Sequence, residues 1–170
     1  MGYLIPSLND VTGRIVSLNR SNGGVPKGPV TEVAVSPHGM DGDRQKHLNH
    51  HGGLERAICL YSFELIEALR AEGHPIVPGA TGENVTIQHL DWRNVQPGAR
   101  LQIGTVTLDV TAYAWPCKQI EHAFADRNST RISEKVHPGW SRVYARVTGS
   151  GVLHVGDTVD LVAPPSLRSA

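Results

Sequence analysis

The sequence is short of cysteine, of net charge and of long hydrophobic runs, and each shortage excludes a class of protein. With two cysteines among 170 residues it can form neither a disulfide-rich scaffold nor a cysteine-rich zinc module, although the two cysteines could form one disulfide with each other. No apolar run approaches the roughly 18 residues of a membrane-spanning helix, so we expect no membrane partner. The N-terminus lacks the basic lead and apolar stretch of a secretory signal, which predicts a cytoplasmic location.

The charged residues are balanced, and turn-forming residues are abundant. Lys and Arg number 16 and Asp and Glu also number 16, a balance that predicts no nucleic-acid partner. The 18 glycines and 11 prolines argue against long helices, because an interior glycine costs about 1 kcal/mol and an interior proline about 3 kcal/mol. The length predicts one domain over residues 1–170, with its core at about 12–162 and a tail at 163–170.

Apolar and polar residues alternate in several short segments, as they do in half-buried strands. These segments are 13–18, 30–35, 101–103, 106–110, 143–147, 152–155 and 159–162. Gly104-Thr105 separates two of them and shifts the apolar parity, which predicts a tight hairpin. We therefore expect a mainly β domain of about six to eight strands, arranged as a barrel.

Helical signals are few and short. Ser62 is predicted to cap a helix over residues 63–72. A second short helix is expected after Pro116, since proline is favoured at the first helical positions. A third turn of helix is expected to begin near Ser129, with Ser129 or Thr130 as its cap. These small helices are predicted to cover the openings of the barrel.

Cys117 is the strongest candidate for chemistry. The segment Trp115-Pro116-Cys117-Lys118 places its thiol at a strand end, at a predicted helix N-terminus and beside a cation, and all three features favour the thiolate. A thiolate is both a nucleophile and a soft metal ligand. The alternative is a buried, inert thiol that only fills the core. That structural role is the one predicted for Cys59, which lies in the apolar segment 57–61.

Two glycine-containing segments are further candidates. His47-Leu-Asn-His50-His51-Gly52-Gly53 matches no zinc-binding spacing, so we interpret it as a loop whose glycines let backbone amides approach a ligand. A surface turn with solvated imidazoles is the alternative. In the second segment, 79–85, Glu83 and Asn84 are poor strand formers, and they hold either a ligand or the loop itself.

Taken in order, these motifs resemble the MOSC family, a name that stands for the C-terminal domain of molybdenum cofactor sulfurase. The resemblance runs from about Thr12 to Val162, and Pro26-Lys27 resembles the family's early lysine segment. The motifs that carry it are His51-Gly-Gly-x-x-Arg56-Ala, Gly82-Glu-Asn, Arg100-x-x-Ile-Gly104 and Pro116-Cys117. Gly139-Trp140 is similar to the stand-alone bacterial branch that is implicated in detoxifying N-hydroxylated bases.

The resemblance implies a MOSC-type β-barrel that binds molybdenum cofactor (Mo-molybdopterin) and uses Cys117 as its molybdenum ligand. It implies a molybdenum-dependent oxidoreductase that reduces a small-molecule N-hydroxylated purine or amine. The electrons would come from a separate electron-donor protein, and we expect a monomer or a homodimer. The alternatives are a sulfur-carrier or cofactor-delivery protein, which uses a Cys117 persulfide or the bound cofactor, and an inert ligand-binding barrel.

The resemblance also suggests which residues surround the cofactor. The suggested partners of the pterin and its phosphate are Lys27, Gly52, Gly53, Arg56, Glu83, Asn84 and Lys118. His51 or Asp43 is expected to act with Cys117 in catalysis as a proton relay, because histidine titrates near neutrality. One departure matters: the bacterial branch often has an arginine three residues before the cysteine, where this chain has Ala114. Trp115 is expected to line the pocket instead.

Overall fold

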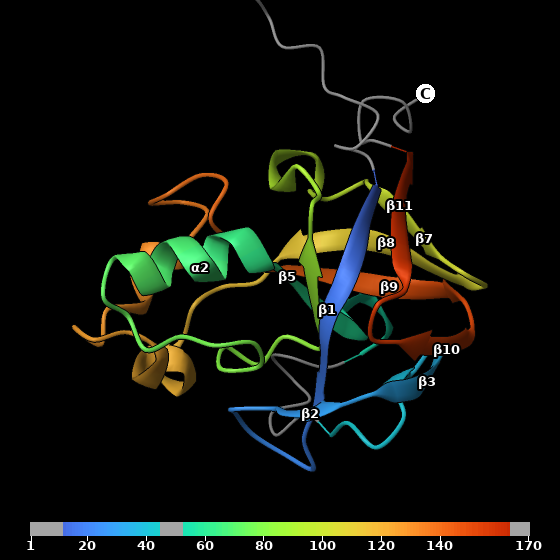
Figure 1. Cartoon of the computed structure of the whole chain (residues 1–170), viewed down its shortest axis with the longest axis horizontal. Helices are drawn as coiled ribbons and strands as arrows, with labels where there is room; N and C mark the ends of the chain where they lie inside the picture. The colour runs from blue at the N-terminus through green and yellow to red at the C-terminus, as the bar shows by residue number, and fades with distance from the viewer. Residues whose placement is uncertain (1–11, 45–52, 164–170) are drawn as a thin grey trace, which may run out of the picture.

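Seven strands close into a barrel that forms the body of the protein (Figure 1). The computed structural model describes residues 12–44 and 53–163. Around the barrel the strands are β11 (Thr158–Ala163), β7 (Arg100–Ile103), β8 (Val106–Tyr113), β9 (Val143–Gly149), β5 (Ile58–Ser62), β6 (Val85–Gln88) and β1 (Thr12–Arg20). β1 pairs back with β11 and so completes the closure, which leaves no free edge on these strands. The predicted mainly β barrel is confirmed.

Four shorter strands complete the described part of the chain. β2 (Gly28–Val30) extends the barrel sheet from β1, while β10 (Gly151–His154), β3 (Glu32–Ser36) and β4 (Gly39–Met40) form a separate small sheet. The prediction of one continuous strand over 30–35 is wrong, because the chain changes sheets at Thr31. Val30 pairs with Leu18 of the barrel, whereas Val35 pairs with Gly151 of the small sheet. The alternation of side chains is interrupted here, since Thr31 and Glu32 are both exposed and Val30 does not share the parity of the buried Val33 and Val35.

The hairpin predicted at Gly104-Thr105 is confirmed. β7 and β8 pair antiparallel across it, with Ile103 opposite Val106 and Leu101 opposite Leu108. All four of these side chains are buried, so the shift of parity across the turn keeps both strands facing one core. Gly104 adopts a φ of 59°, a left-handed conformation that glycine reaches at little cost.

The helix that follows β5 allows the barrel to contain one parallel pair of strands. β5 and β6 run parallel, so the chain must cross over between them, and α2 (Phe63–Ala71) lies in that crossover. The Ser62 hydroxyl accepts a hydrogen bond from the Leu65 amide at 3.2 Å, which confirms the predicted cap. Ile66 and Leu69 are completely buried against the barrel.

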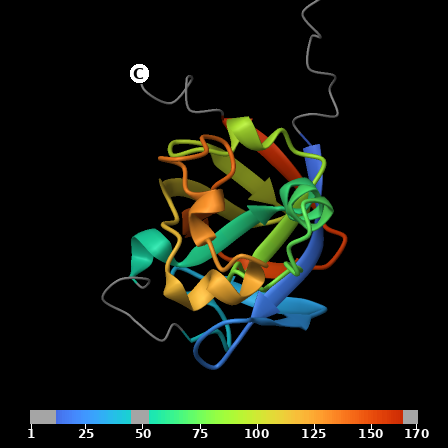
Figure 2. The same ribbon diagram turned by 90° about the vertical axis from the view of Figure 1, so that its left-hand side faces the viewer.

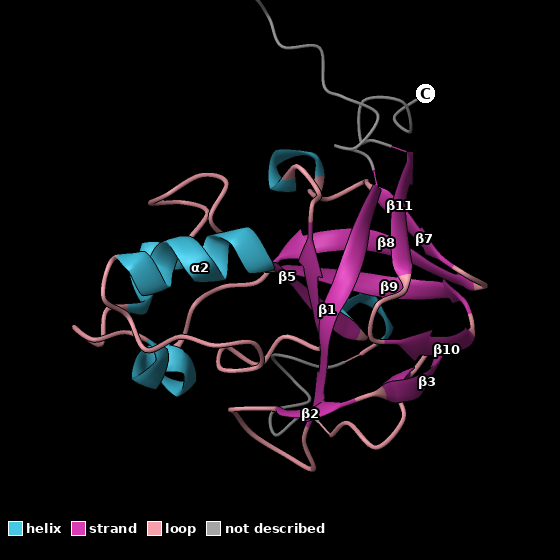
Figure 3. Cartoon of the chain, viewed as in Figure 1, coloured by secondary structure: helices cyan, strands magenta, loops and turns pink. Residues whose placement is uncertain are grey.

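The remaining helices are short 3-10 helices. η4 (Lys118–Ala123) and η5 (Ser129–Ile132) lie with α2 on one side of the barrel (Figure 3), and Figure 2 shows the protein from that side. The cap of η5 is Asn128, whose Oδ1 accepts the Thr130 amide at 3.2 Å, so the prediction of Ser129 or Thr130 as cap is wrong. η2 (Leu54–Arg56) and η3 (Trp92–Asn94) are shorter still. In the described residues, no helix is long and apolar enough to span a membrane.

The α2 cap gives a direct test of how this crossover is stabilised. Ser62→Ala removes the oxygen that accepts the Leu65 amide, and we expect the free energy of unfolding to fall by about 1 kcal/mol in chemical denaturation. Ser150→Ala is the matched control, because Ser150 is exposed and should change stability by less than about 0.5 kcal/mol. Equal stabilities for the two variants would show that the cap contributes nothing.

Candidate functional site

Cys117 lies where β8 gives way to η4. The three-residue connection 114–116 leads from the end of β8 to Cys117, which immediately precedes Lys118 at the start of η4. Its backbone is extended (φ −138°, ψ 175°), and its thiol is half-buried and makes no cap hydrogen bond. The predicted position at a strand end and helix start is confirmed. η4 is a 3-10 helix of only six residues, so it lacks the summed dipole of a long α-helix.

Cys59 has the opposite environment, although both cysteines are free thiols. It lies within β5 and is only 4% exposed, packed with Ala114 and Tyr144. Burial raises the pKa of the Cys59 thiol to about 11, so this group stays protonated and unreactive at neutral pH. The prediction of a structural role for Cys59 is confirmed.

The ring of Tyr144 on β9 contacts the predicted arginine. The Arg56 guanidinium carbon lies 5.5 Å from the centre of this ring, a cation–π contact. Burial raises the pKa of the Tyr144 hydroxyl to about 12, with smaller influences from neighbours that include Arg56 and Cys117. Arg56 and Cys117 are 61 positions apart in the sequence, and both act electrostatically on the same hydroxyl.

Arg142 is the central residue that the sequence did not reveal. Its side chain is buried, and its two terminal nitrogens bind carbonyl oxygens of different loops. Nη1 donates to Thr81 at 2.6 Å, and Nη2 donates to Trp115 at 3.1 Å. The guanidinium therefore joins the turn before Glu83 to the segment that carries Cys117. The only sequence signal is a charged residue directly before the apolar segment 143–147.

Arg142 has one polar atom left over. Its Nε is buried and has no hydrogen-bond partner in the part of the chain that the structure describes. Unpartnered buried donors are uncommon in folded proteins, because each one costs about 1–3 kcal/mol of lost solvation. An acceptor supplied by a ligand would remove that cost, and an anionic acceptor would also neutralise the buried charge.

Glu83 holds the turn that Arg142 contacts. Its carboxylate is completely buried, with Oε1 accepting the Gly79 amide and Oε2 accepting the Thr81 hydroxyl, both at 2.5 Å. Burial raises the pKa of Glu83, while these hydrogen bonds and the nearby Arg142 charge act in the opposite direction. Gly79 is required here, because its φ is 85° and an added Cβ would overlap the carbonyl oxygen of Lys27. Of the two predicted alternatives for Glu83, the structure shows the one in which it orients the loop.

Lys27, Asp43 and Asn84 form one buried polar network. Lys27 Nζ lies 2.8 Å from Asp43 Oδ2, and their side chains are 7% and 4% exposed. Asn84 Nδ2 donates to the same oxygen at 3.0 Å, and the Ser21 amide donates to Oδ1 at 3.0 Å. Asn84 Oδ1 in turn accepts the Cys59 amide at 2.9 Å. The structure thus brings three predicted site residues together, but their polar groups are directed at one another.

The other predicted residues are dispersed or not described. His51 and Gly52 lie outside the described residues. Gly53, with φ 93°, directly precedes the η2 turn that ends at Arg56, and Lys118 is exposed at the start of η4. Among the described side chains there is no group of three or more His, Cys, Asp and Glu that would hold a metal ion by itself.

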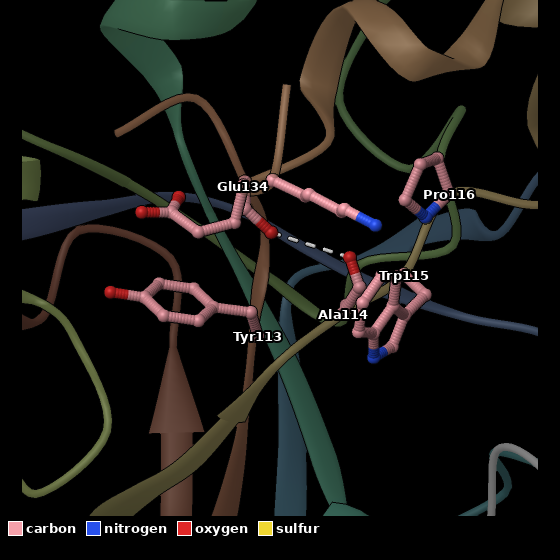
Figure 4. Close-up of a pocket in the computed structure, with 7 residues that line it drawn as sticks. Tyr113, Ala114, Trp115, Pro116 and Glu134 are labelled. Atoms are coloured by element: carbon pink, nitrogen blue, oxygen red, sulfur yellow. Dashed lines mark hydrogen bonds between the residues drawn. The ribbon is translucent and has the colours of Figure 1, made fainter. Parts of the chain in front are cut away.

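Trp115 lines a hollow next to the cysteine (Figure 4). The hollow has a volume of about 260 Å³, and its other walls include Tyr113, Pro116 and Glu134. The indole of Trp115 is 65% exposed, which is unusual for so large an apolar side chain. A second hollow of about 280 Å³ adjoins the first and shares Tyr113, Glu134 and Ser141 with it.

A closed β-barrel with an accessible cysteine at a strand end defines the class to which this protein belongs. The family model of the MOSC domain matches residues 47–160, which is more than half of the chain. The chain therefore belongs to the MOSC domain family. Cys117, Glu83 and Arg142 all lie within the matched residues.

Similar proteins support this assignment. The chain is 25% identical over 142 residues to the uncharacterized protein YflK of Bacillus subtilis (strain 168), covering 82% of this chain and 63% of YflK. It is 31% identical over 139 residues to a protein of Gibberella moniliformis named "Reductase", covering 78% of this chain but 24% of that protein. The crystal structure of YiiM from Geobacillus stearothermophilus has a TM-score of 0.67 and 27% identity, covering 89% of this chain and 75% of YiiM.

The contrast between the two cysteines can be measured directly. In the folded protein at pH 8, we expect iodoacetamide to modify Cys117 and to leave Cys59 unmodified, because the Cys59 thiol is buried and its pKa is about 11. Peptide mass spectrometry would locate the adduct, and denaturation before labelling should make both sites react. Cys117→Ser is the control and should take up no label while folded. Native labelling of Cys59 alone would contradict the structure.

The bridge made by Arg142 can be tested by its contribution to stability. Arg142→Met keeps much of the side-chain volume but leaves the Thr81 and Trp115 carbonyls without their donor, so we expect the free energy of unfolding to fall by about 2 kcal/mol or more. Arg93→Met is the matched control, because the Arg93 ion pair is at the surface and should contribute less than about 1 kcal/mol. If the two variants unfold alike, the bridge is not a structural support.

Proposed function

We propose that this protein binds molybdenum cofactor through Cys117 and reduces N-hydroxylated purines or related amines. The observation that carries the proposal is the pairing of a half-buried thiol with a buried guanidinium that has an unpartnered Nε, on adjoining segments of a MOSC barrel. The Gibberella moniliformis relative named "Reductase" supports the class of reaction.

The residues around Cys117 fit an anionic group. Arg142, Arg56 and the exposed Lys118 carry positive charge, and no carboxylate among the described residues forms an ion pair with Arg142. Cys117 would supply the sulfur ligand, Arg142 and Arg56 would neutralise anionic parts of the cofactor, and Lys118 would meet its phosphate. Among the described residues, a Cβ added at Gly53 would meet no atom within 4 Å.

The buried network has a supporting role in this proposal. Lys27, Asn84 and Glu83 use their polar atoms on neighbouring loops, so they fix the position of the site rather than contact the cofactor. Asp43 has the same supporting role, because its two carboxylate oxygens already accept hydrogen bonds from three donors. We therefore assign the proton transfer to His51, because histidine is the residue type whose unperturbed pKa lies nearest to neutral pH.

The proposed reaction cleaves one N–O bond and forms one N–H bond. The hydroxylamine takes up two electrons and two protons, and it leaves as an amine and a water molecule. The bound cofactor would supply the two-electron redox centre. The electrons come from a separate electron-transfer protein, and the protons come from solvent by way of His51.

A sulfur-carrier or cofactor-delivery role is the second candidate. The match to the reductase relative covers 24% of that protein, so its activity does not by itself assign turnover to the matched region. An accessible thiol between cations is also suited to hold a persulfide, which is anionic. In this role Cys117 would be loaded with sulfur or cofactor, but no hydroxylamine would be turned over.

Metal and pterin analysis of protein from a cofactor-replete host tests the proposal. We expect about one molybdenum and one pterin per chain in the wild type, and loss of both in Cys117→Ser. Cys59→Ser is the matched control and should keep its cofactor, because Cys59 is sealed within β5. Reduction of a hydroxylamine with an artificial electron donor would support the reductase. Cofactor without turnover would support the carrier, and cofactor retained by Cys117→Ser would overturn both.

A further inference from the structure

Two hollows lie along the segment that leads to Cys117, and their linings share Tyr113, Glu134 and Ser141. We refer to these two adjoining hollows together as the groove. Their volumes are about 260 and 280 Å³, and small-molecule sites usually have roughly 300–1,000 Å³. Pro116, the residue before Cys117, lines the first hollow.

One end of the groove is suited to a flat ring. Its walls are Trp115, Pro116 and the ring of Tyr113, and the exposed indole offers a large aromatic face. Stacking of a nucleobase on an aromatic side chain contributes roughly 1–3 kcal/mol and does not depend on which base is bound. This end therefore favours a planar nitrogen heterocycle without selecting among such rings.

The other end offers hydrogen-bonding groups. Glu134 Oε2 accepts the Gly139 amide at 2.9 Å, whereas in the described residues its Oε1 has no hydrogen-bond partner, and neither has the Tyr113 hydroxyl. Burial, followed by the charge of Glu134, raises the pKa of Tyr113, so the two side chains lie close to each other. Figure 4 shows both pointing to one side, away from Trp115 and Pro116. Gln96 lines the same hollow.

We infer that the substrate is a planar nitrogen heterocycle carrying a hydroxyl-rich substituent, as in a nucleoside, and that this groove binds it. Trp115 stacks on the heterocycle at the Cys117 end. The free oxygen of Glu134 accepts hydroxyl groups of the substituent at the other end, because a carboxylate is an acceptor and sugar hydroxyls are donors. The inference rests on the proposed function, because the role of Cys117 decides which end of the groove receives the reacting heterocycle. It adds which part of the substrate binds at each end.

Calorimetric titration of the full-length chain with 6-hydroxylaminopurine and with its riboside tests the inference. We expect the riboside to bind about tenfold more tightly than the base, which corresponds to one hydrogen bond to a charged group. Glu134→Gln should reduce this difference severalfold without weakening the base. The glutamine can still accept the Gly139 amide, but it replaces the charged acceptor with a neutral amide, whose hydrogen bond to a hydroxyl is about half as strong. Glu67→Gln, on the exposed face of α2, is the matched control and should change neither affinity.

Trp115→Ala should weaken both ligands about tenfold, and Trp115→Phe should restore part of the loss. Trp115 is mostly exposed, so both variants are expected to fold, and equal melting temperatures would confirm this. The inference is overturned if base and riboside bind equally to the wild type, if neither binds, or if Trp115→Ala leaves both affinities unchanged. Titration of cofactor-free protein keeps this result separate from the molybdenum analysis, because either one can fail alone.

Discussion

The site depends on one buried guanidinium. Arg142 holds the carbonyl oxygens of Thr81 and Trp115, which belong to loops that the barrel alone would not join. Without this cation, both carbonyls would lose a charge-assisted hydrogen bond, and the segment leading to Cys117 would lose its link to the Glu83 turn. A rigid positive charge at the entrance of η4 is also what an anionic ligand requires, so the same residue supports the structure and prepares the site.

The polar residues of the site fall into two groups according to whether a polar side-chain atom lacks a hydrogen-bond partner. The side chains of Lys27, Asp43, Asn84 and Glu83 are buried, and they bond to one another or to neighbouring amide and hydroxyl groups. Such a network is costly to break, because removal of one partner leaves the charge of the other buried with neither a counter-charge nor solvent around it. Arg142 and Glu134 each keep an unpartnered polar atom among the described residues. Ligand recognition belongs to the second group, and rigidity to the first.

Local patterns in the sequence predicted the parts of the fold that depend on neighbours along the chain. Ser62 caps α2 through a residue three positions away, and the hairpin at Gly104 follows from parity within eight residues. The opposite characters of Cys59 and Cys117 also followed from their own segments. The change of sheet at Thr31 was missed because residues 30–35 were interpreted as one strand, although Val30 and Val33 have opposite parity.

Contacts between distant segments could not be predicted in this way. The pair of Lys27 with Asp43 and the pair of Arg142 with Thr81 join residues 16 and 61 positions apart, and no spacing rule connects them. Motif resemblance placed Lys27, Glu83 and Asn84 at the site, but it did not show that their polar groups face inward. Burial and hydrogen-bond partners decide that distinction, and both are properties of the folded chain.

The absence of an arginine at position 114 shows why this distinction matters. Ala114 is buried and has no charge to offer, yet its amide donates to the Arg142 carbonyl at 2.9 Å. The two residues are therefore neighbours across β8 and β9, and the Arg142 side chain reaches the same segment by its bond to Trp115. A positive charge is thus held at Trp115, two residues before Cys117, although it comes from the residue that precedes β9. The charge near a site depends on which residues are close in the folded structure rather than on their positions in the sequence. The site is therefore best compared with those of its relatives by geometry.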